Sequence, residues 1–178
     1  MKDKAAAVTV RAFGPHDEDA VNALARAAFA QYEGHYDDWP SFIDGIGRMA
    51  GLAGGGDLLV AEHGGAIVGA VVHVGPGRPR SPVFPYAWSV IRMLVVAPGA
   101  RGMGIGRQLV AACLECARRD RAPAVGLHTS PLMASALRLY TGIGFRRDSD
   151  LPPIKGVPYG RYVLPAEDIN AALEILAA

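Results

Sequence analysis

The pattern of hydrophobic and polar positions over the first 50 residues predicts one strand followed by two helices. Residues 8–13 alternate between apolar and polar positions, as a half-buried strand does. Acidic residues after Pro15 are typical of a helix start, and an apolar stripe at helical spacing continues over residues 20–31. A second, shorter helix is predicted over residues 39–50.

The middle of the chain predicts three strands. Residues 57–62 and 66–74 are apolar runs, and His63-Gly64-Gly65 between them favours a hairpin because glycine readily adopts a positive φ. The proline-rich residues 75–85 cannot form a central strand, since proline lacks the N–H that a strand ladder needs. The apolar run that follows predicts a strand over residues 86–96.

The second half of the chain alternates helices with strands. The predicted elements are a helix over 104–119, a strand over 124–128, a helix over 133–141, a final hairpin of 145–147 with 159–164, and a helix over 166–177. We expect residues 150–156 to form an irregular connection within that hairpin. The last helix is expected to turn Leu173, Ile175 and Leu176 inward.

Length and charge narrow the class of protein. The chain has 178 residues, which predicts a single domain over residues 1–178, and 51% of them are hydrophobic. The formal net charge of +1 argues against a nucleic-acid or membrane partner. No apolar run approaches the roughly 20 residues of a membrane span, and the first seven residues lack the apolar stretch of a secretory signal. We therefore expect a cytoplasmic protein.

A glycine-rich stretch, Arg101-Gly102-Met103-Gly104-Ile105-Gly106, lies between an apolar strand and an apolar helix. The first N–H groups of a helix have no partner within it and attract anions, while glycine lets a phosphate approach the backbone. Arg101 and Arg107 add positive charge. The third glycine of a dinucleotide-binding fingerprint is absent, because position 107 is arginine, and the Gly-Lys-Ser/Thr of a P-loop is absent too. A plain turn is the structural alternative.

A second segment supports the anion-binding interpretation. The motif in this segment begins with an alanine, either Ala134 or Ala136, and continues with Leu139-Tyr140 and Gly144-Phe145. The arrangement A-x-x-L-Y-x-x-x-G-F, placed after R-x-x-G-x-G, resembles the GNAT superfamily of N-acetyltransferases. The resemblance is detailed over residues 86–147 and looser elsewhere.

The resemblance implies a fold, a co-substrate and a reaction. The fold would be of the α/β (α+β) class, with a mixed, mostly antiparallel sheet flanked by helices and splayed between its fourth and fifth strands. The reaction would move an acetyl group from acetyl-CoA to the primary amine of a small molecule or peptide by direct transfer. The main chain at the end of the fourth strand would pair with the pantetheine arm and supply an oxyanion donor. The candidate cofactor-binding residues are Leu94, Val95, Val96, Arg101, Gly102, Met103, Gly104, Ile105, Gly106, Arg107 and Ser135.

Two side chains are candidates for catalysis. Tyr140 matches the tyrosine of the family motif, and a phenol with a pKa near ~10 can donate a proton to the leaving sulfur. Its alternative role is packing against pantetheine. His128 lies twelve positions earlier, where related protein N-terminal acetyltransferases carry a glutamate base. It is either the general base or a structural residue hydrogen-bonded across the splayed strands.

The acceptor site is predicted in the loop between the first two helices and in the proline-rich loop. The candidate substrate-binding residues are Tyr32, His35, Tyr36, Trp39 and Tyr86. Arg78 and Arg80 suggest an acceptor that carries a carboxylate, and a solvated loop with aromatic anchors is the alternative. Many family members have an asparagine near the position of Met133, and Ser130 or Ser135 is expected to replace its contact with pantetheine.

The two cysteines, Cys113 and Cys116, have C-x-x-C spacing but lie within a predicted helix, so we interpret them as buried apolar residues. No second ligand pair is present for zinc, and we expect no metal. A non-catalytic acyl-CoA-binding sensor or interaction module on the same fold is the alternative function. The oligomeric state stays open, with a homodimer as one alternative.

Overall fold

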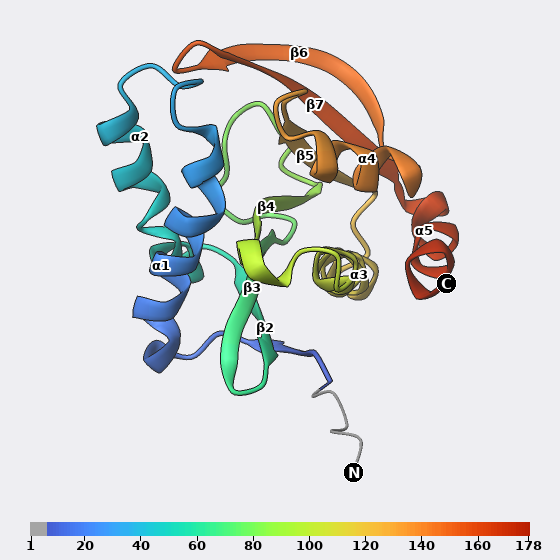
Figure 1. Cartoon of the computed structure of the whole chain (residues 1–178). Coiled ribbons are helices and arrows are strands. Elements are labelled where there is room, and N and C mark those ends of the chain that lie inside the picture. Colours follow the sequence, from blue (N-terminus) through green and yellow to red (C-terminus); the bar gives the residue numbers. More distant parts are fainter. Residues whose placement is uncertain (1–6) are drawn as a thin grey trace.

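The computed structural model describes residues 7–178 and contains a single seven-stranded sheet with helices on both sides (Figure 1). The strands are β1 Thr9–Ala12, β2 Asp57–His63, β3 Ala66–Val74, β4 Ser89–Val96, β5 Ala124–Thr129, β6 Arg146–Ile154 and β7 Val157–Pro165. The α-helices are α1 Glu18–Phe29, α2 Trp39–Ile46, α3 Ile105–Arg119, α4 Ala134–Gly142 and α5 Ile169–Ala177.

The sheet has the order β1-β2-β3-β4-β5-β7-β6. Every neighbouring pair is antiparallel except β4 with β5, which is parallel. These two strands pair at only two positions, Ser89 with Val125 and Val90 with Gly126, and then diverge. We call the gap in hydrogen bonding after these pairs the split. The mixed, mostly antiparallel sheet and the splay between the fourth and fifth strands confirm the predicted fold class.

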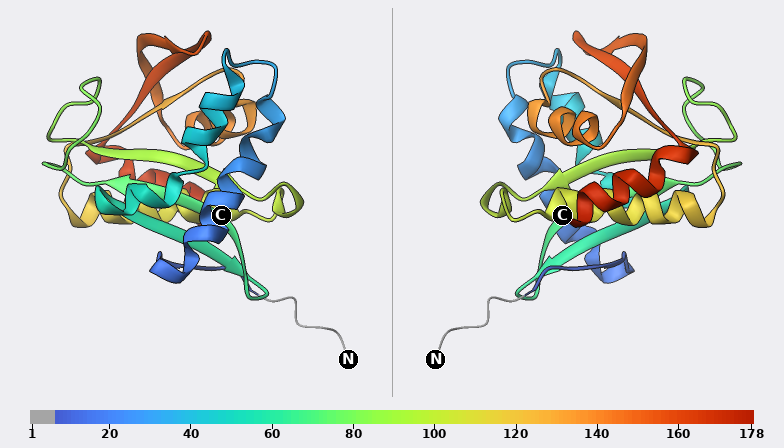
Figure 2. Two further views of the ribbon diagram at one scale, coloured as in Figure 1. Left: turned by 90° about the vertical axis from the view of Figure 1, so that its left-hand side faces the viewer. Right: turned by 90° about the vertical axis from the view of Figure 1, so that its right-hand side faces the viewer.

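The two faces of the sheet carry separate cores. On one face, α1 packs Val21, Leu24 and Phe29 against β2, β3 and β4, and the left view of Figure 2 shows α1 and α2 in front of the sheet. On the other face, α3 buries Leu109 and Leu114, and α5 covers part of α3, as the right view shows. Between the two cores, β4 and β5 stop pairing after Val90 and Gly126, and the sheet opens there.

The predicted turn between β2 and β3 is confirmed. Gly64 has a φ of 58° and Gly65 a φ of 80°, which are left-handed values that two-residue hairpin turns require. Among residues 7–178, no helix combines the length and the apolar character needed to cross a membrane.

Some predicted boundaries are wrong. β6 runs through residues 150–154, which we expected to be irregular, and it includes Pro152 and Pro153. It lies at the edge of the sheet, where a strand can do without some of its N–H groups, and its register shifts between Leu151 and Ile154. The second helix ends at Ile46, and a 3₁₀ segment follows after Gly47. The final α-helix begins at Ile169 after a 3₁₀ turn.

The inward orientation of the last helix holds in part. Leu173 and Leu176 pack against the core beneath α3, whereas Ile175 is 45% exposed. Ile175 therefore does not face inward as predicted, because one further position along a helix rotates a side chain by about 100°.

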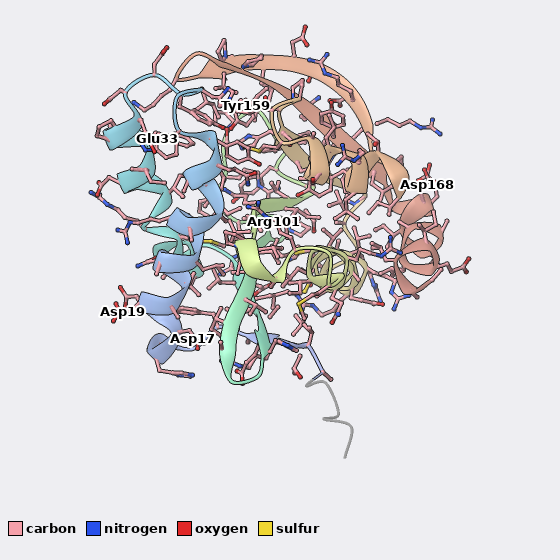
Figure 3. All side chains as sticks on the ribbon, in the orientation of Figure 1. Asp17, Asp19, Glu33, Arg101, Tyr159 and Asp168 are labelled. Atoms are coloured by element: carbon pink, nitrogen blue, oxygen red, sulfur yellow. The ribbon has the colours of Figure 1, made fainter. Side chains whose placement is uncertain are left out.

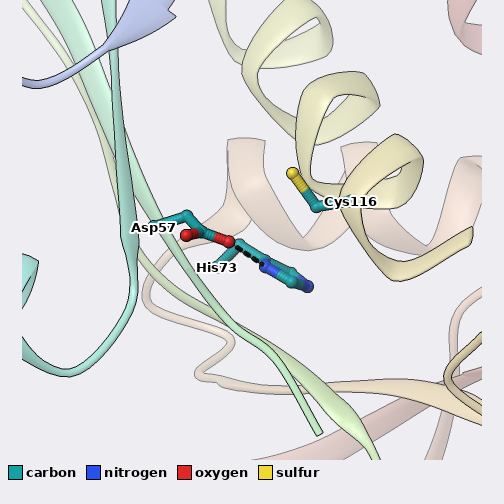
Figure 4. A group of neighbouring side chains, drawn as sticks. All are labelled: Asp57, His73 and Cys116. Atoms are coloured by element: carbon teal, nitrogen blue, oxygen red, sulfur yellow. Dashed lines mark hydrogen bonds and ion pairs between the residues drawn. The ribbon is translucent and has the colours of Figure 1, made fainter. Parts of the chain in front are cut away.

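The cysteines lie on α3, as predicted, with Cys113 fully buried and Cys116 half-buried. Burial raises the pKa of both thiols. Cys116 lies beside Asp57 and His73, and their donor atoms are all within 4.8 Å of one another (Figure 4). The Nδ1 atom of His73 is 3.1 Å from the Asp57 carboxylate and its Nε2 atom is 2.9 Å from the Ser89 hydroxyl. This hydrogen-bonded network gives both nitrogens of the buried imidazole a partner.

The start of α1 is fixed by the buried carboxylate of Asp17. Arg11 donates two hydrogen bonds to it, at 2.7 and 3.0 Å, and the N–H of Gly14 donates a third at 2.9 Å. Arg11, opposed by burial, lowers the pKa of Asp17 from 3.8 to about 2. The ionised carboxylate therefore stabilises the folded state above pH 4, and this contribution is lost as the pH falls towards 2.

We expect Asp17→Asn to lower the free energy of unfolding at pH 7 by about 2 kcal/mol, because one pKa unit corresponds to about 1.4 kcal/mol. Urea denaturation at pH 7 and at pH 3 measures this effect, which should be smaller at pH 3. Asp19→Asn is the matched control, since Asp19 lies two residues later, in the first turn of α1, but is exposed (Figure 3). Equal losses in the two variants would contradict a special role for Asp17.

Candidate functional site

A groove of about 640 Å³ lies where the C-terminal half of β4, the start of α3, the end of α1 and the start of α4 meet. All but one of the predicted cofactor-binding residues line it: Leu94, Val95, Val96, Arg101, Gly102, Gly104, Ile105, Gly106, Arg107 and Ser135. Met103 is the exception, and its side chain is 43% exposed. The structure therefore brings together residues from two motifs that are separate in the sequence.

The glycine loop gives the groove its anion-binding character. Gly102 and Gly104 have φ values of 81° and 75°, so the loop uses the left-handed conformation that glycine tolerates best. The helix α3 begins directly after Gly104. Its first backbone hydrogen bond runs from the N–H of Gln108 to the carbonyl of Gly104. The N–H groups of the first turn are therefore free of helical partners and lie at the groove.

The two arginines of the loop differ in their surroundings. Arg101, labelled in Figure 3, is exposed and lines the groove, as does Tyr32. Burial raises the pKa of Tyr32, and the charge of Arg101 partly offsets this rise. The guanidinium of Arg107 donates to the backbone carbonyl of Ile175 in α5. Arg107 therefore links the groove to the last helix, while Arg101 keeps its charge available to a ligand.

A bulge in β4 borders the groove. Ala70 pairs with Val95 and Val72 with Arg92, so both Met93 and Leu94 lie opposite the single residue between Ala70 and Val72. Met93 has a φ of 53°, a left-handed conformation that costs a residue with a side chain about 1–2 kcal/mol. A bulge leaves the extra residue without its ladder partner, so backbone groups next to Leu94 are available to a ligand.

Tyr140 of α4 is a buried residue and is not among the residues that line the groove. The side chain is 5% exposed, packs edge-on against Phe145 and belongs to the core on the α3 face. Burial raises the pKa of Tyr140 well above 10, so its hydroxyl stays protonated throughout the neutral range. Leu139 and Ala136 of the same helix line the groove instead.

His128 lies on β5 at the split. Its ring is 6.0 Å from that of Phe84 and 5.3 Å from that of Tyr159, measured between centroids. Burial lowers the pKa of His128 below 6.5, and the nearby guanidinium of Arg92 lowers it further, so the imidazole is neutral at pH 7. Its side chain still reaches solvent and makes no hydrogen bond to another residue in the range 7–178. The cross-strand hydrogen bond of the structural alternative is therefore not formed.

The loop between α1 and α2 meets the β6–β7 hairpin above the split. The hydroxyls of Tyr36 and Tyr159 hydrogen-bond to each other, and burial raises the pKa of both phenols. At the hairpin turn, the ammonium of Lys155 lies 3.2 Å from the carboxylate of Asp38. The backbone N–H of Asp37 donates a hydrogen bond of 2.8 Å to the carbonyl of Lys155. Figures 1 and 3 show this hairpin arching from α4 towards the loop. We call these three contacts the bridge.

The predicted acceptor residues are not all at one place. Tyr32 lines the groove, Tyr36 is buried in the bridge and Trp39 is half-buried beside it, 6.4 Å from Tyr36 between ring centroids. His35 is exposed on the loop. Tyr86 is 64% exposed and lies against Arg80, outside the groove.

The arginines of the proline-rich loop serve the loop itself. Arg80 donates to the carbonyls of Gly75, Arg78, Pro85 and Trp88, and Arg78 lies 3.8 Å from the Asp57 carboxylate. Ser130 accepts the N–H of Leu132 in a turn, and Ser135 lines the groove while accepting from Arg138. Ser135 is therefore better placed than Ser130 to contact a ligand.

Several residues at the site gave no sequence signal. Ala28 and Phe29 line the groove from the end of α1, and Gln31 lines it from the 3₁₀ segment that follows, although the helix was predicted from its acidic start and its apolar stripe with no indication of a site. Arg92 and Tyr159 flank His128, but they come from β4 and β7, and only the strand pairing brings them near β5.

Comparison with known proteins agrees with this geometry. The model of the Acetyltransferase (GNAT) family matches residues 19–145. A mycothiol acetyltransferase of Frankia casuarinae is 33% identical over 149 residues, which cover 79% of this chain but 42% of that protein. The chain thus spans less than half the length of that relative.

Solved structures show the same fold. The ribosomal-protein-alanine N-acetyltransferase of Brucella melitensis has a TM-score of 0.66 at 23% identity, covering 88% of this chain and 99% of its own. The structure of yncA from Salmonella typhimurium with its cofactor acetyl-CoA has a TM-score of 0.66 at 19% identity, covering 90% and 94%. The family match, spanning both motifs and the groove they form, shows that the chain belongs to the GNAT family of acetyltransferases.

Proposed function

We propose that the protein is an acetyl-CoA-dependent N-acetyltransferase that acetylates a primary amine of a small molecule or peptide by direct transfer. The observation that carries this proposal is the groove, in which the glycine loop, the β4 bulge and the start of α4 face one another. The name of the mycothiol acetyltransferase relatives does not carry the acceptor, because the chain matches less than half of each of those proteins.

The residues present fit the diphosphate and the pantetheine arm of acetyl-CoA. A Cβ at Gly106 would be 3.7 Å from Leu139 and 4.0 Å from Leu94 and Val96, so this glycine keeps the middle of the groove open. The first turn of α3 and Arg101 supply N–H donors and positive charge for the phosphates. When bound there, the thioester supplies the activated acetyl group.

The chain's own groups then have separate tasks. Backbone N–H groups beside Leu94 are suited to stabilise negative charge that develops on the acetyl oxygen, a contribution of about 3 kcal/mol for one fixed donor. Tyr140 holds a proton for the departing sulfur, and His128, neutral at pH 7, accepts a proton from the amine.

The function is tested by release of free thiol from acetyl-CoA over a panel of aminoglycosides, polyamines, amino acids and peptide N-termini, with calorimetric titration of acetyl-CoA alongside. Release with at least one acceptor is expected. Tight binding without transfer to any amine would instead identify an acyl-CoA-binding module. No binding at all would overturn the proposal.

We expect His128→Gln to lower kcat/KM about tenfold at pH 7. In the native protein kcat/KM should decrease as the pH drops below 6.5, because the imidazole becomes protonated, and the variant should lack this acidic limb of the pH profile. The profile is measured by initial rates between pH 5 and 9. His16→Gln is the control, because His16 is 76% exposed in the 3₁₀ turn that precedes α1 and is far along the chain from the split. An unchanged acidic limb in His128→Gln would remove the base role.

A further inference from the structure

Arg92 and His128 occupy equivalent places on the two strands that border the split. Val90 of β4 pairs with Gly126 of β5 in parallel register. Residues two positions further along each strand point to the same face of a sheet, so Arg92 and His128 lie on one face, on opposite sides of the split. The effect of the Arg92 charge on His128 agrees with this placement.

That face is the one covered elsewhere by α1 and by the proline-rich loop. Val90 packs in the α1 core, and a Cβ at Gly126 would be 2.9 Å from both Phe84 and Trp88. Residues of central strands are normally covered on such a face. Arg92 and His128 are nevertheless both exposed, so the molecule is open at this point.

Within residues 7–178, no carboxylate pairs with the guanidinium of Arg92. It forms no hydrogen bond and no ion pair with another residue in the range 7–178, whereas Arg11 and Arg161 are each paired with aspartate. Although the Arg92 side chain reaches solvent, neighbouring atoms cover part of it, and this partial burial lowers the pKa of Arg92. A partly desolvated arginine is stabilised most by an anion that accepts two parallel hydrogen bonds.

We propose that Arg92 binds a carboxylate or phosphate group of the acceptor, so that the substrates are amines that carry an anionic group beside the reacting nitrogen. This inference rests on the proposed function. The anion would contact β4, while the amine would face His128 across the split. The rings of Phe84 and Tyr159 lie close to the imidazole of His128.

The same charge disfavours other acceptors. A polyamine or aminoglycoside would bring several ammonium groups towards an unpaired guanidinium, and like charges brought together in this way lower affinity. From the sequence, Arg78 and Arg80 were the candidates to bind a carboxylate of the acceptor. We assign this role to Arg92 instead, because Arg80 donates to carbonyls of its own loop and Arg78 lies against Asp57.

The first test needs no turnover. Phenylglyoxal modifies accessible arginines, and peptide mapping of the native protein separates Arg92 from Arg101 and Arg107. We expect benzoate or inorganic phosphate to slow modification of Arg92 at least fivefold and benzamide to have no effect, with Arg118 unprotected as the control. The benzoate and phosphate arms show which anion is preferred. Equal modification with and without both anions would overturn the proposal.

The second test is kinetic. The ratio of kcat/KM for phenylalanine over phenylalaninamide, and for phosphoethanolamine over ethanolamine, is measured in the native protein and in Arg92→Gln. Comparing ratios cancels the different basicities of the amines. We expect at least one ratio to fall tenfold or more in Arg92→Gln and neither to change in Arg118→Gln, which removes an exposed charge from α3.

The outcomes separate the two proposals. Acetylation with ratios that Arg92→Gln leaves unchanged would refute the anion site and keep the acetyltransferase function. Protection of Arg92 by benzoate or phosphate without acetylation of any amine would refute the acetyltransferase function and keep the anion site.

Discussion

Gly106→Glu is expected to raise the Kd for acetyl-CoA at least 100-fold while the protein remains folded. Gly106 lies in the first turn of α3 with ordinary helical geometry, and a Cβ there meets no atom closer than 3.7 Å. The backbone therefore accepts a side chain, and a carboxylate near a helix N-terminus favours the helix. The same carboxylate would extend into the groove beside the first turn of α3, where we propose that the phosphates of acetyl-CoA bind. The expected loss is about 2.7 kcal/mol of binding free energy or more.

Calorimetric titration with acetyl-CoA measures the loss, and thermal unfolding checks the fold. Gly51→Glu is the matched control, because Gly51 is exposed and a Cβ there meets nothing within 4 Å. Gly106→Ala is a milder variant that should retain binding to within about tenfold. Unimpaired binding by Gly106→Glu would mean that acetyl-CoA does not lie across the start of α3.

Tyr140→Phe is expected to lower kcat about 100-fold and to leave the KM for acetyl-CoA nearly unchanged, since proton transfer by a positioned group contributes 10²–10⁴-fold. The ring packs against Phe145 in the core, and phenylalanine keeps that contact. Because burial raises the pKa of Tyr140, the hydroxyl holds its proton at every pH used in an assay. Only the donated proton is removed by the substitution.

Steady-state rates with a saturating acceptor measure this effect. Tyr162→Phe is the control, because Tyr162 is buried in the same core but belongs to β7. An equal fall in kcat in both variants would indicate a general effect of losing a buried hydroxyl. A normal rate in Tyr140→Phe would assign the tyrosine to packing alone.

Strong local patterns predicted most of the fold. The apolar runs of β2, β3 and β4 predict strands, and the apolar stripe of α3 predicts a helix. These predictions hold because the apolar positions of these elements are the ones buried in the two cores of the sheet. The extent of β6 could not be predicted in this way. Prolines at 152 and 153 argue against a strand locally, and only the place of β6 at the edge of the sheet permits one.

The candidate site likewise has parts that local sequence predicts and parts that depend on how the strands pair. The glycine loop and the start of α4 are each a short continuous segment of the sequence, and residues from both line the groove. The left-handed Met93 was not predictable, because nothing in its side chain requires a positive φ and the bulge depends on the pairing of β3 with β4. The cluster of Asp57, His73 and Cys116 depends on strand register and helix packing, so spacing along the chain did not reveal it.

The bridge restricts how an acceptor can arrive. The bonded pairs Tyr36–Tyr159 and Lys155–Asp38 connect the β6–β7 hairpin to the loop after α1. A bulky acceptor approaching through them would have to break those contacts in every catalytic cycle. An amine at the tip of a slender, flexible molecule would leave those contacts intact, so for the proposed acceptor site we expect a preference for narrow substrates in addition to the proposed preference for anionic ones.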